Sequence, residues 1–108
     1  MNLEDIKAKL RSYKREEITF YEPHFTHQLL ARGGSKEEFI KEILKAGSLF
    51  YYEKVIGKYG DNVFVLYFKV SNTRMFIVPV IFDKNNRKNL YIMTYILRHR
   101  LFNGGRNG

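Results

Sequence analysis

The chain has 108 residues, with 19 basic and 11 acidic side chains and a formal net charge of +8. It is long enough for one domain with a real core, and it has no cysteine for a disulfide or a thiolate metal site. Its apolar runs are too short to span a bilayer. We therefore expect a single cytoplasmic domain over residues 1–108, with no secretion signal and no membrane partner.

The positive charge is concentrated in the second part of the chain. Residues 1–61 hold 11 basic and 10 acidic groups, a balance of +1, whereas residues 62–108 hold eight basic groups and only Asp83, a balance of +7. Segregated positive charge attracts polyanions, so RNA or another nucleic acid is the partner that we favour. The alternative is that these groups only keep a small protein in solution. They are Lys69, Arg74, Lys84, Arg87, Lys88, Arg98, Arg100 and Arg106.

The first predicted element is a helix over Leu3–Tyr13. Asn2 can cap it, acids occupy its first turn, and its apolar residues fall on one stripe. The opposite face is basic and either faces solvent or touches phosphates. A short β-rich run follows at Ile18–Tyr21.

Two more helices are predicted after this run. The first begins near Pro23 and ends at the glycine pair Gly33–Gly34, because proline suits a first helical turn and glycine suits a helix end. The second begins at Ser35, which forms a capping box with Glu38, and stops at Gly47. We expect the two helices to form a hairpin that lies against a sheet.

From residue 49 onward the pattern is typical of strands. The predicted strands are Leu49–Ile56, Val63–Val70, Met75–Phe82 and Leu90–Leu97, and Val63–Val70 has the uninterrupted apolar pattern of the most interior one. Short turns between them predict an antiparallel sheet of about four to five strands, with the helices on one face. This is an α+β fold. Pro79 cannot donate a hydrogen bond, so we expect a bulge or an unpaired edge there.

The histidines and one arginine are the first candidates for chemistry. His24 and His27 share a helix face, and three interpretations of His24 are open: a metal ligand with His27 and His99, a partly buried hydrogen-bonding residue, or a general acid or base. No carboxylate completes an HExxH pattern, and we predict neither a metal nor another cofactor. Arg32 either pairs with helix-end carbonyls or with Glu22, or binds a phosphate.

Several hydrolase classes are disfavoured by what the sequence lacks. No serine lies in a nucleophile elbow, no glycine-rich phosphate loop follows a strand, and the acids are not paired for glycosidase chemistry. Cations among tyrosines suit single-stranded RNA, although strand tyrosines are also common in cores. The predicted nucleic-acid-binding residues are Arg74, Lys84, Arg87, Lys88, Tyr95 and Arg100.

A longer pattern combines a strand at Ile18–Phe20, His24 near a helix start, the junction Arg32-Gly33-Gly34-Ser35, and Thr94-Tyr95 in the final strand. It resembles a group of small uncharacterised prokaryotic domains that is similar to the BrnT and RelE-like toxins, which are compact α+β proteins that cleave RNA. The chain departs from the group at Gly34, where an aliphatic residue is usual.

The resemblance implies three segments and an activity. The segments are a helical extension over 1–16, a RelE/BrnT-like core over 17–97, and a basic tail over 98–108 that we expect to be flexible. The implied activity is that of an RNA-directed toxin, a metal-independent endoribonuclease, with an antitoxin or a second copy as its protein partner. The alternatives are a nucleic-acid-binding module without catalysis and a protein-protein interaction domain. The predicted catalytic set is His24, Arg32, Arg98 and His99, in which the histidines move protons and the arginines stabilise phosphate charge.

Overall fold

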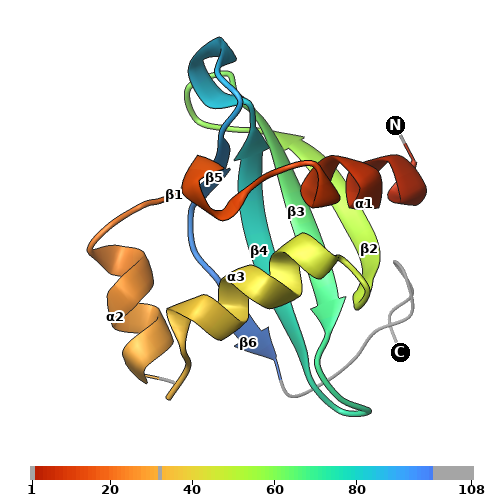
Figure 1. Ribbon diagram of the computed structural model, residues 1–108, viewed down its shortest axis with the longest axis vertical. Helices are drawn as coiled ribbons and strands as arrows, with labels where there is room; N and C mark the ends of the chain where they lie inside the picture. Colours follow the sequence, from red (N-terminus) through yellow and green to blue (C-terminus); the bar gives the residue numbers. More distant parts are fainter. Residues whose placement is uncertain (1, 32, 99–108) are drawn as a thin grey trace.

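Three α-helices and a six-stranded sheet make up the part of the chain that the computed structural model describes, residues 2–31 and 33–98 (Figure 1). The helices are α1 (Leu3–Arg11), α2 (His24–Ala31) and α3 (Lys36–Lys45), and two 3-10 turns are η1 (Arg15–Glu17) and η2 (Lys84–Asn86). The strands are β1 (Ile18–Phe20), β2 (Leu49–Ile56), β3 (Asn62–Lys69), β4 (Met75–Phe82), β5 (Leu90–Ile92) and β6 (Ile96–Arg98). The fold class is α+β, as predicted.

The centre of the sheet is β4. The strand order is β1-β5-β4-β3-β2, and β6 also pairs with β4. Most side chains of β4 are buried on both faces, whereas only part of β3 is buried. The prediction that Val63–Val70 is the most interior strand was therefore wrong. The reason is that β3 lies beside β2, whose second half is exposed and leaves its neighbour partly uncovered.

One strand pair is parallel. β1 lies beside β5 with Ile18 opposite Leu90 and Phe20 opposite Ile92, while the other pairs are antiparallel. A purely antiparallel sheet was predicted because the strands after residue 49 follow one another through hairpins. β1, however, lies between α1 and α2 in the chain, and it completes the sheet by pairing with β5 at one edge.

The predicted last strand, Leu90–Leu97, is interrupted and forms β5 and β6. Residues 93–95 between them are not in a strand, and the Met93 N–H donates to the Pro79 carbonyl at 3.1 Å. In a strand the N–H and C=O of one residue point to the same side, so the missing N–H of Pro79 faces this interruption. Pro79 thus lies in the central strand, beside a break in its neighbour, and not at a free edge of the sheet as one of the two predicted alternatives had it.

The helix starts follow the predicted caps in part. Asn2 forms a full capping box with Asp5, whereas of the box predicted at Ser35 the structure has the half in which the Ser35 hydroxyl accepts from the Glu38 N–H at 3.4 Å. The first helix ends at Arg11 rather than Tyr13. The third ends at Lys45, and its C-cap in the left-handed conformation is Ala46, with φ of 58°, rather than Gly47.

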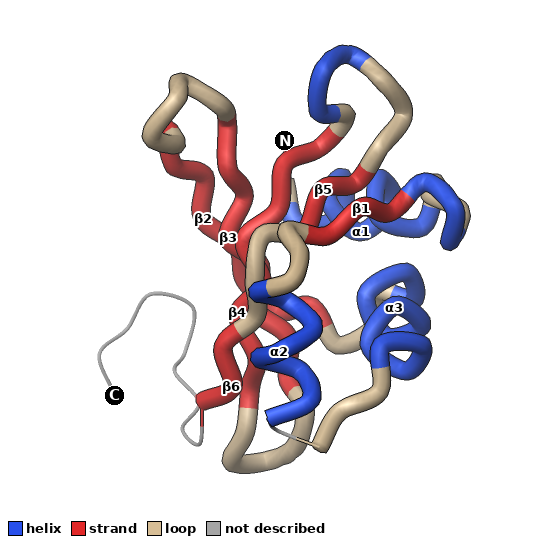
Figure 2. The backbone as a smooth tube through the Cα atoms, turned by 90° about the vertical axis from the view of Figure 1, so that its left-hand side faces the viewer, coloured by secondary structure: helices blue, strands red, loops and turns tan. Residues whose placement is uncertain are grey.

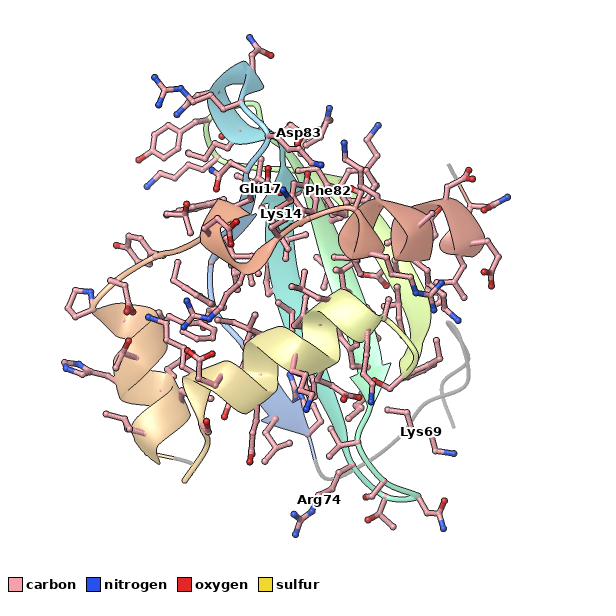
Figure 3. All side chains as sticks on the ribbon, in the orientation of Figure 1. Lys14, Glu17, Lys69, Arg74, Phe82 and Asp83 are labelled. Atoms are coloured by element: carbon pink, nitrogen blue, oxygen red, sulfur yellow. The ribbon has the colours of Figure 1, made fainter. Side chains whose placement is uncertain are left out.

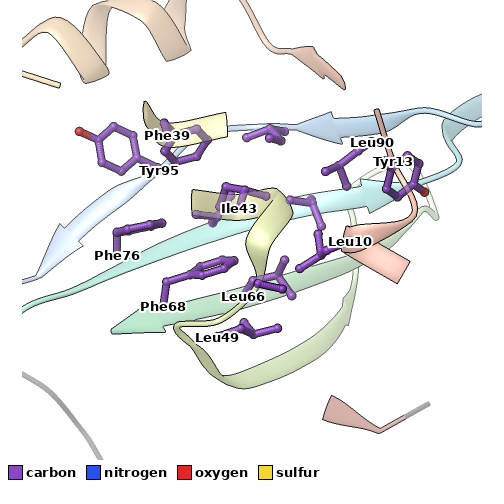
Figure 4. Packing of buried hydrophobic residues seen from close by; sticks show 14 of the residues in the cluster. Leu10, Tyr13, Phe39, Ile43, Leu49, Leu66, Phe68, Phe76, Leu90 and Tyr95 are labelled. Atoms are coloured by element: carbon purple, nitrogen blue, oxygen red, sulfur yellow. The ribbon is translucent and has the colours of Figure 1, made fainter. Parts of the chain in front are cut away.

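All three helices lie on one side of the sheet, and α2 stands at the edge beside β6 (Figure 2). The core between the layers is almost wholly apolar and aromatic, with Phe39 and Ile43 of α3 above Leu66 and Phe68 of β3 (Figure 4). No buried polar side chain occurs among the described residues. Within the same residues, no helix is long and apolar enough to cross a membrane.

Candidate functional site

The start of α2 presents two histidines to solvent. Phe25 and Leu29, four residues apart, are buried and hold the helix against the core, whereas His24 and His27 are exposed on its other side. Of the three interpretations of His24, this position fits a reactive group better than a buried structural one.

Glu22 holds the first turn of α2 in place. Its carboxylate accepts from the Thr26 N–H at 2.9 Å, from the Thr26 hydroxyl, and from Nζ of Lys36 at 2.9 Å. The Thr26 side-chain hydrogen bond, followed by that of Lys36, lowers the pKa of Glu22 from 4.5 to about 2. Glu22 is therefore an ionised cap of the helix that carries His24, and its charge is compensated locally.

His24 meets the break between β5 and β6. Its Nε2 lies 3.5 Å from Oγ1 of Thr94, and the Thr94 hydroxyl donates to Oε1 of Gln28, one helical turn after His24. The Thr94 hydroxyl therefore lies between the His24 imidazole and the Gln28 amide, and the tautomer of His24 decides which group donates in the His24–Thr94 contact.

This contact joins two parts of the family-like pattern that are 70 residues apart in sequence. The His24 position comes from the helix and Thr94 from the final strand region. The contact lies at the strand interruption opposite Pro79.

Tyr95, by contrast, is a core residue. Its ring is 6% exposed and lies 5.4 Å from Phe39, 5.9 Å from Phe25 and 6.2 Å from Phe76. A ring enclosed in this way has no face for a nucleic-acid base, so its predicted role in binding is corrected to one in packing.

The described cations of the second half form two groups rather than one face. Arg74 and Lys69 lie at the β3–β4 turn, and Asp83 marks the opposite end of the sheet, where the β4–β5 loop begins (Figure 3). Arg98 belongs to the first group, because it pairs with Met75 across the strands, as Lys69 does on the other side. The loop carries the second group, Lys84, Arg87 and Lys88.

The two groups have different surroundings. In the first, burial and then Glu53 raise the pKa of Tyr67 above its usual value, and the charge of the nearby Arg98 makes this rise smaller. In the second, Lys84 lies 4.8 Å from the centre of the Tyr91 ring, and Lys88 pairs with Glu17 at 3.9 Å. A shallow pocket at the second end is lined by Lys9, Asp83, Asn86, Arg87 and Lys88.

Three predicted site residues, Arg32, His99 and Arg100, lie outside the described residues. In the described ranges, 2–31 and 33–98, no three His, Cys, Asp or Glu side chains gather where a metal ion could be held. Neither family models, nor curated proteins, nor solved structures give a match to this chain.

Sequence reasoning missed Gln28 and Tyr21 as members of the site. Gln28 follows His24 by four residues, so the helical spacing alone could have paired them. Tyr21 is 55% exposed, and its ring centre lies 5.9 Å from that of His24. No local pattern distinguishes such a tyrosine from one in the core.

Proposed function

We propose that this protein is an RNA-directed, toxin-like endoribonuclease of the RelE/BrnT type that acts without a metal ion, with His24 as a proton-transferring residue. The observation that carries the proposal is the contact between His24 and Thr94. It leaves an exposed imidazole beside the break between β5 and β6, with its Nε2 3.5 Å from the Thr94 hydroxyl, and an accessible imidazole is the group that most often transfers protons in catalysis.

The proposed reaction is transfer of the RNA phosphate to the neighbouring 2′-hydroxyl. His24 accepts the 2′-hydroxyl proton as the oxygen attacks phosphorus, and the bond from phosphorus to the 5′-oxygen breaks. His99 is assigned the proton that this leaving oxygen needs. The products are a 2′,3′-cyclic phosphate and a 5′-hydroxyl, so atoms and charges balance. The arginines of the predicted set, Arg32 and Arg98, are assigned to the phosphate charge.

The decisive experiment compares two exposed histidines of the same helix. Purified wild-type protein is incubated with RNA, with and without ribosomes and with a chelator present, and the ends of the products are analysed. We expect His24→Ala to lower the cleavage rate at least about a hundredfold. His27→Ala, the matched control, should leave it unchanged. Equal rates for His24→Ala and wild type would overturn the role of His24.

A second candidate function is RNA binding without cleavage. It is favoured by the separation of the cations into two groups at opposite ends of the sheet. Such an arrangement can bind an RNA strand at two places, but it does not gather the cations around a single phosphate. This alternative predicts an intact RNA after incubation and an affinity that falls steeply with salt. A cytoplasmic location, which fits a chain without cysteine, remains part of the proposal, as does an antitoxin or a second copy as the protein partner.

A further inference from the structure

Tyr21 is placed where an RNA base could stack beside His24. It directly follows β1, its N–H donates to the Ile92 carbonyl at 2.9 Å, and its ring stands 5.9 Å from the His24 ring at 52°. More than half of its surface is exposed. The backbone is thus fixed to β5 while the aromatic ring remains accessible.

The same edge of the sheet leads from Tyr21 to the basic loop. Tyr91 of β5 lies opposite Thr19 of β1, and its pKa is raised by burial and by the neighbouring Tyr21 phenol. Lys84 lies over the Tyr91 ring at 4.8 Å. Lys84, Tyr91, Tyr21 and His24 therefore follow one another along the edge formed by β1 and β5.

Three of the acids near this edge are already paired. Glu22 is bonded to Lys36 and Thr26, and Glu17 lies 3.9 Å from Lys88. Asp83 is bonded to Lys9 and Tyr13. Because these three carboxylates are neutralised, they oppose the approach of a phosphate backbone to Lys84 and Arg87 less than free carboxylates would.

We propose that the edge formed by β1 and β5 is a binding site for single-stranded RNA, with one base stacked on Tyr21 and the adjoining phosphates at Lys84 and Arg87. This inference rests on the proposed function only in that the bound RNA strand would lead to His24. Unpaired bases have a free face for an aromatic ring, whereas the bases of a duplex are enclosed by their neighbours. The site therefore selects single strands.

The test measures binding separately from cleavage. The probe is a short single-stranded RNA with blocked 2′-hydroxyls, so that it cannot be cleaved, and with one fluorescent adenine analogue that is quenched on stacking. We expect Tyr21→Ala to weaken binding at least about fivefold and to abolish quenching. Tyr21→Phe should bind within about twofold of wild type, because stacking needs the ring and not the hydroxyl.

The controls identify which proposal fails. Tyr59→Ala removes a tyrosine that is 85% exposed in the β2–β3 turn and should leave binding unchanged. Wild-type binding by Tyr21→Ala, no binding of the probe by any variant, or equal binding of a matched duplex would overturn the inference. Tyr21-dependent binding with no cleavage of natural RNA would support it and refute the nuclease instead.

Discussion

The Tyr13 phenol donates a hydrogen bond of 2.6 Å to Oδ1 of Asp83, 70 residues further along the chain. Lys9 bonds the other carboxylate oxygen, and the Tyr13 ring stacks on Phe82 at 6.3 Å. The segment after α1 is thereby fastened to the start of the β4–β5 loop. Lys9 of α1 also compensates the charge of Asp83, which is the only acid between residues 62 and 108.

Removal of the Tyr13 hydroxyl should destabilise the fold. We expect Tyr13→Phe to lower the free energy of unfolding by about 1–2 kcal/mol, near the lower end for a bond to a charged group, because Asp83 is partly exposed. Urea denaturation at pH 7 measures this. A double-mutant cycle with Asp83→Asn should give a coupling energy of similar size, and strictly additive effects would contradict the proposed bond.

The same tyrosine predicts a pH dependence at the alkaline end. Burial, followed by the hydrogen bond to Asp83, raises the pKa of Tyr13 well above its usual 10.0. The folded state therefore holds the phenol proton more tightly than the unfolded state does, and the contribution is fully present below pH 10 and is lost as the pH rises further. The stability difference between wild type and Tyr13→Phe should shrink above pH 10. A constant difference would refute this.

Glu22 predicts a pH dependence at the acid end. Its folded pKa of about 2 lies below the usual 4.5, so its contribution is present above pH 4.5 and is lost as the pH falls toward 2. We expect Glu22→Gln to cost about 0.5–1 kcal/mol at pH 7, as for the loss of a helix cap, and less at pH 3. Chemical denaturation at several pH values measures the change. Glu16→Gln is the control, because it removes the charge of another exposed carboxylate.

Gly34 should resist substitution because of Leu29. A Cβ at Gly34 would lie 2.6 Å from Cδ1 of Leu29, a side chain that is buried in the core. We expect Gly34→Ala to cost about 1–3 kcal/mol through overpacking. Gly47→Ala is the matched control, since nothing lies within 4 Å of its Cβ, and it should raise stability by about 0.4–1 kcal/mol. Equal thermal midpoints for the two variants would contradict the packing argument.

The two cationic groups can be separated by the salt dependence of RNA binding. If RNA follows the edge formed by β1 and β5, Arg87→Ala should weaken binding and reduce the slope of log affinity against log salt by about 0.7, the value for one phosphate contact of a single strand. Arg74→Ala, at the opposite end, should change neither. If Arg74→Ala weakened binding and Arg87→Ala did not, the RNA would instead bind at the β3–β4 turn.

Much of the fold could be predicted from local patterns. The caps at Asn2 and Ser35, the apolar stripe of each helix and the alternation of strands and turns depend on residues close in sequence, so the α+β class followed from them. The errors arose where one segment depends on a distant one. The interior strand is β4 rather than β3 because β4 has β5 and β6 on one side and β3 on the other. The last strand is broken because its neighbour contains Pro79.

By itself the amino-acid sequence determined the element types, the excess of cations after residue 61 and the choice of His24 as a candidate. Only the tertiary structure decided that His24 meets Thr94, that Tyr95 is enclosed in the core, and that the described cations divide between two ends of the sheet. The physical reason is that capping and periodicity act over a few residues. Contacts between residues 70 apart depend instead on how strands pair and which faces helices cover.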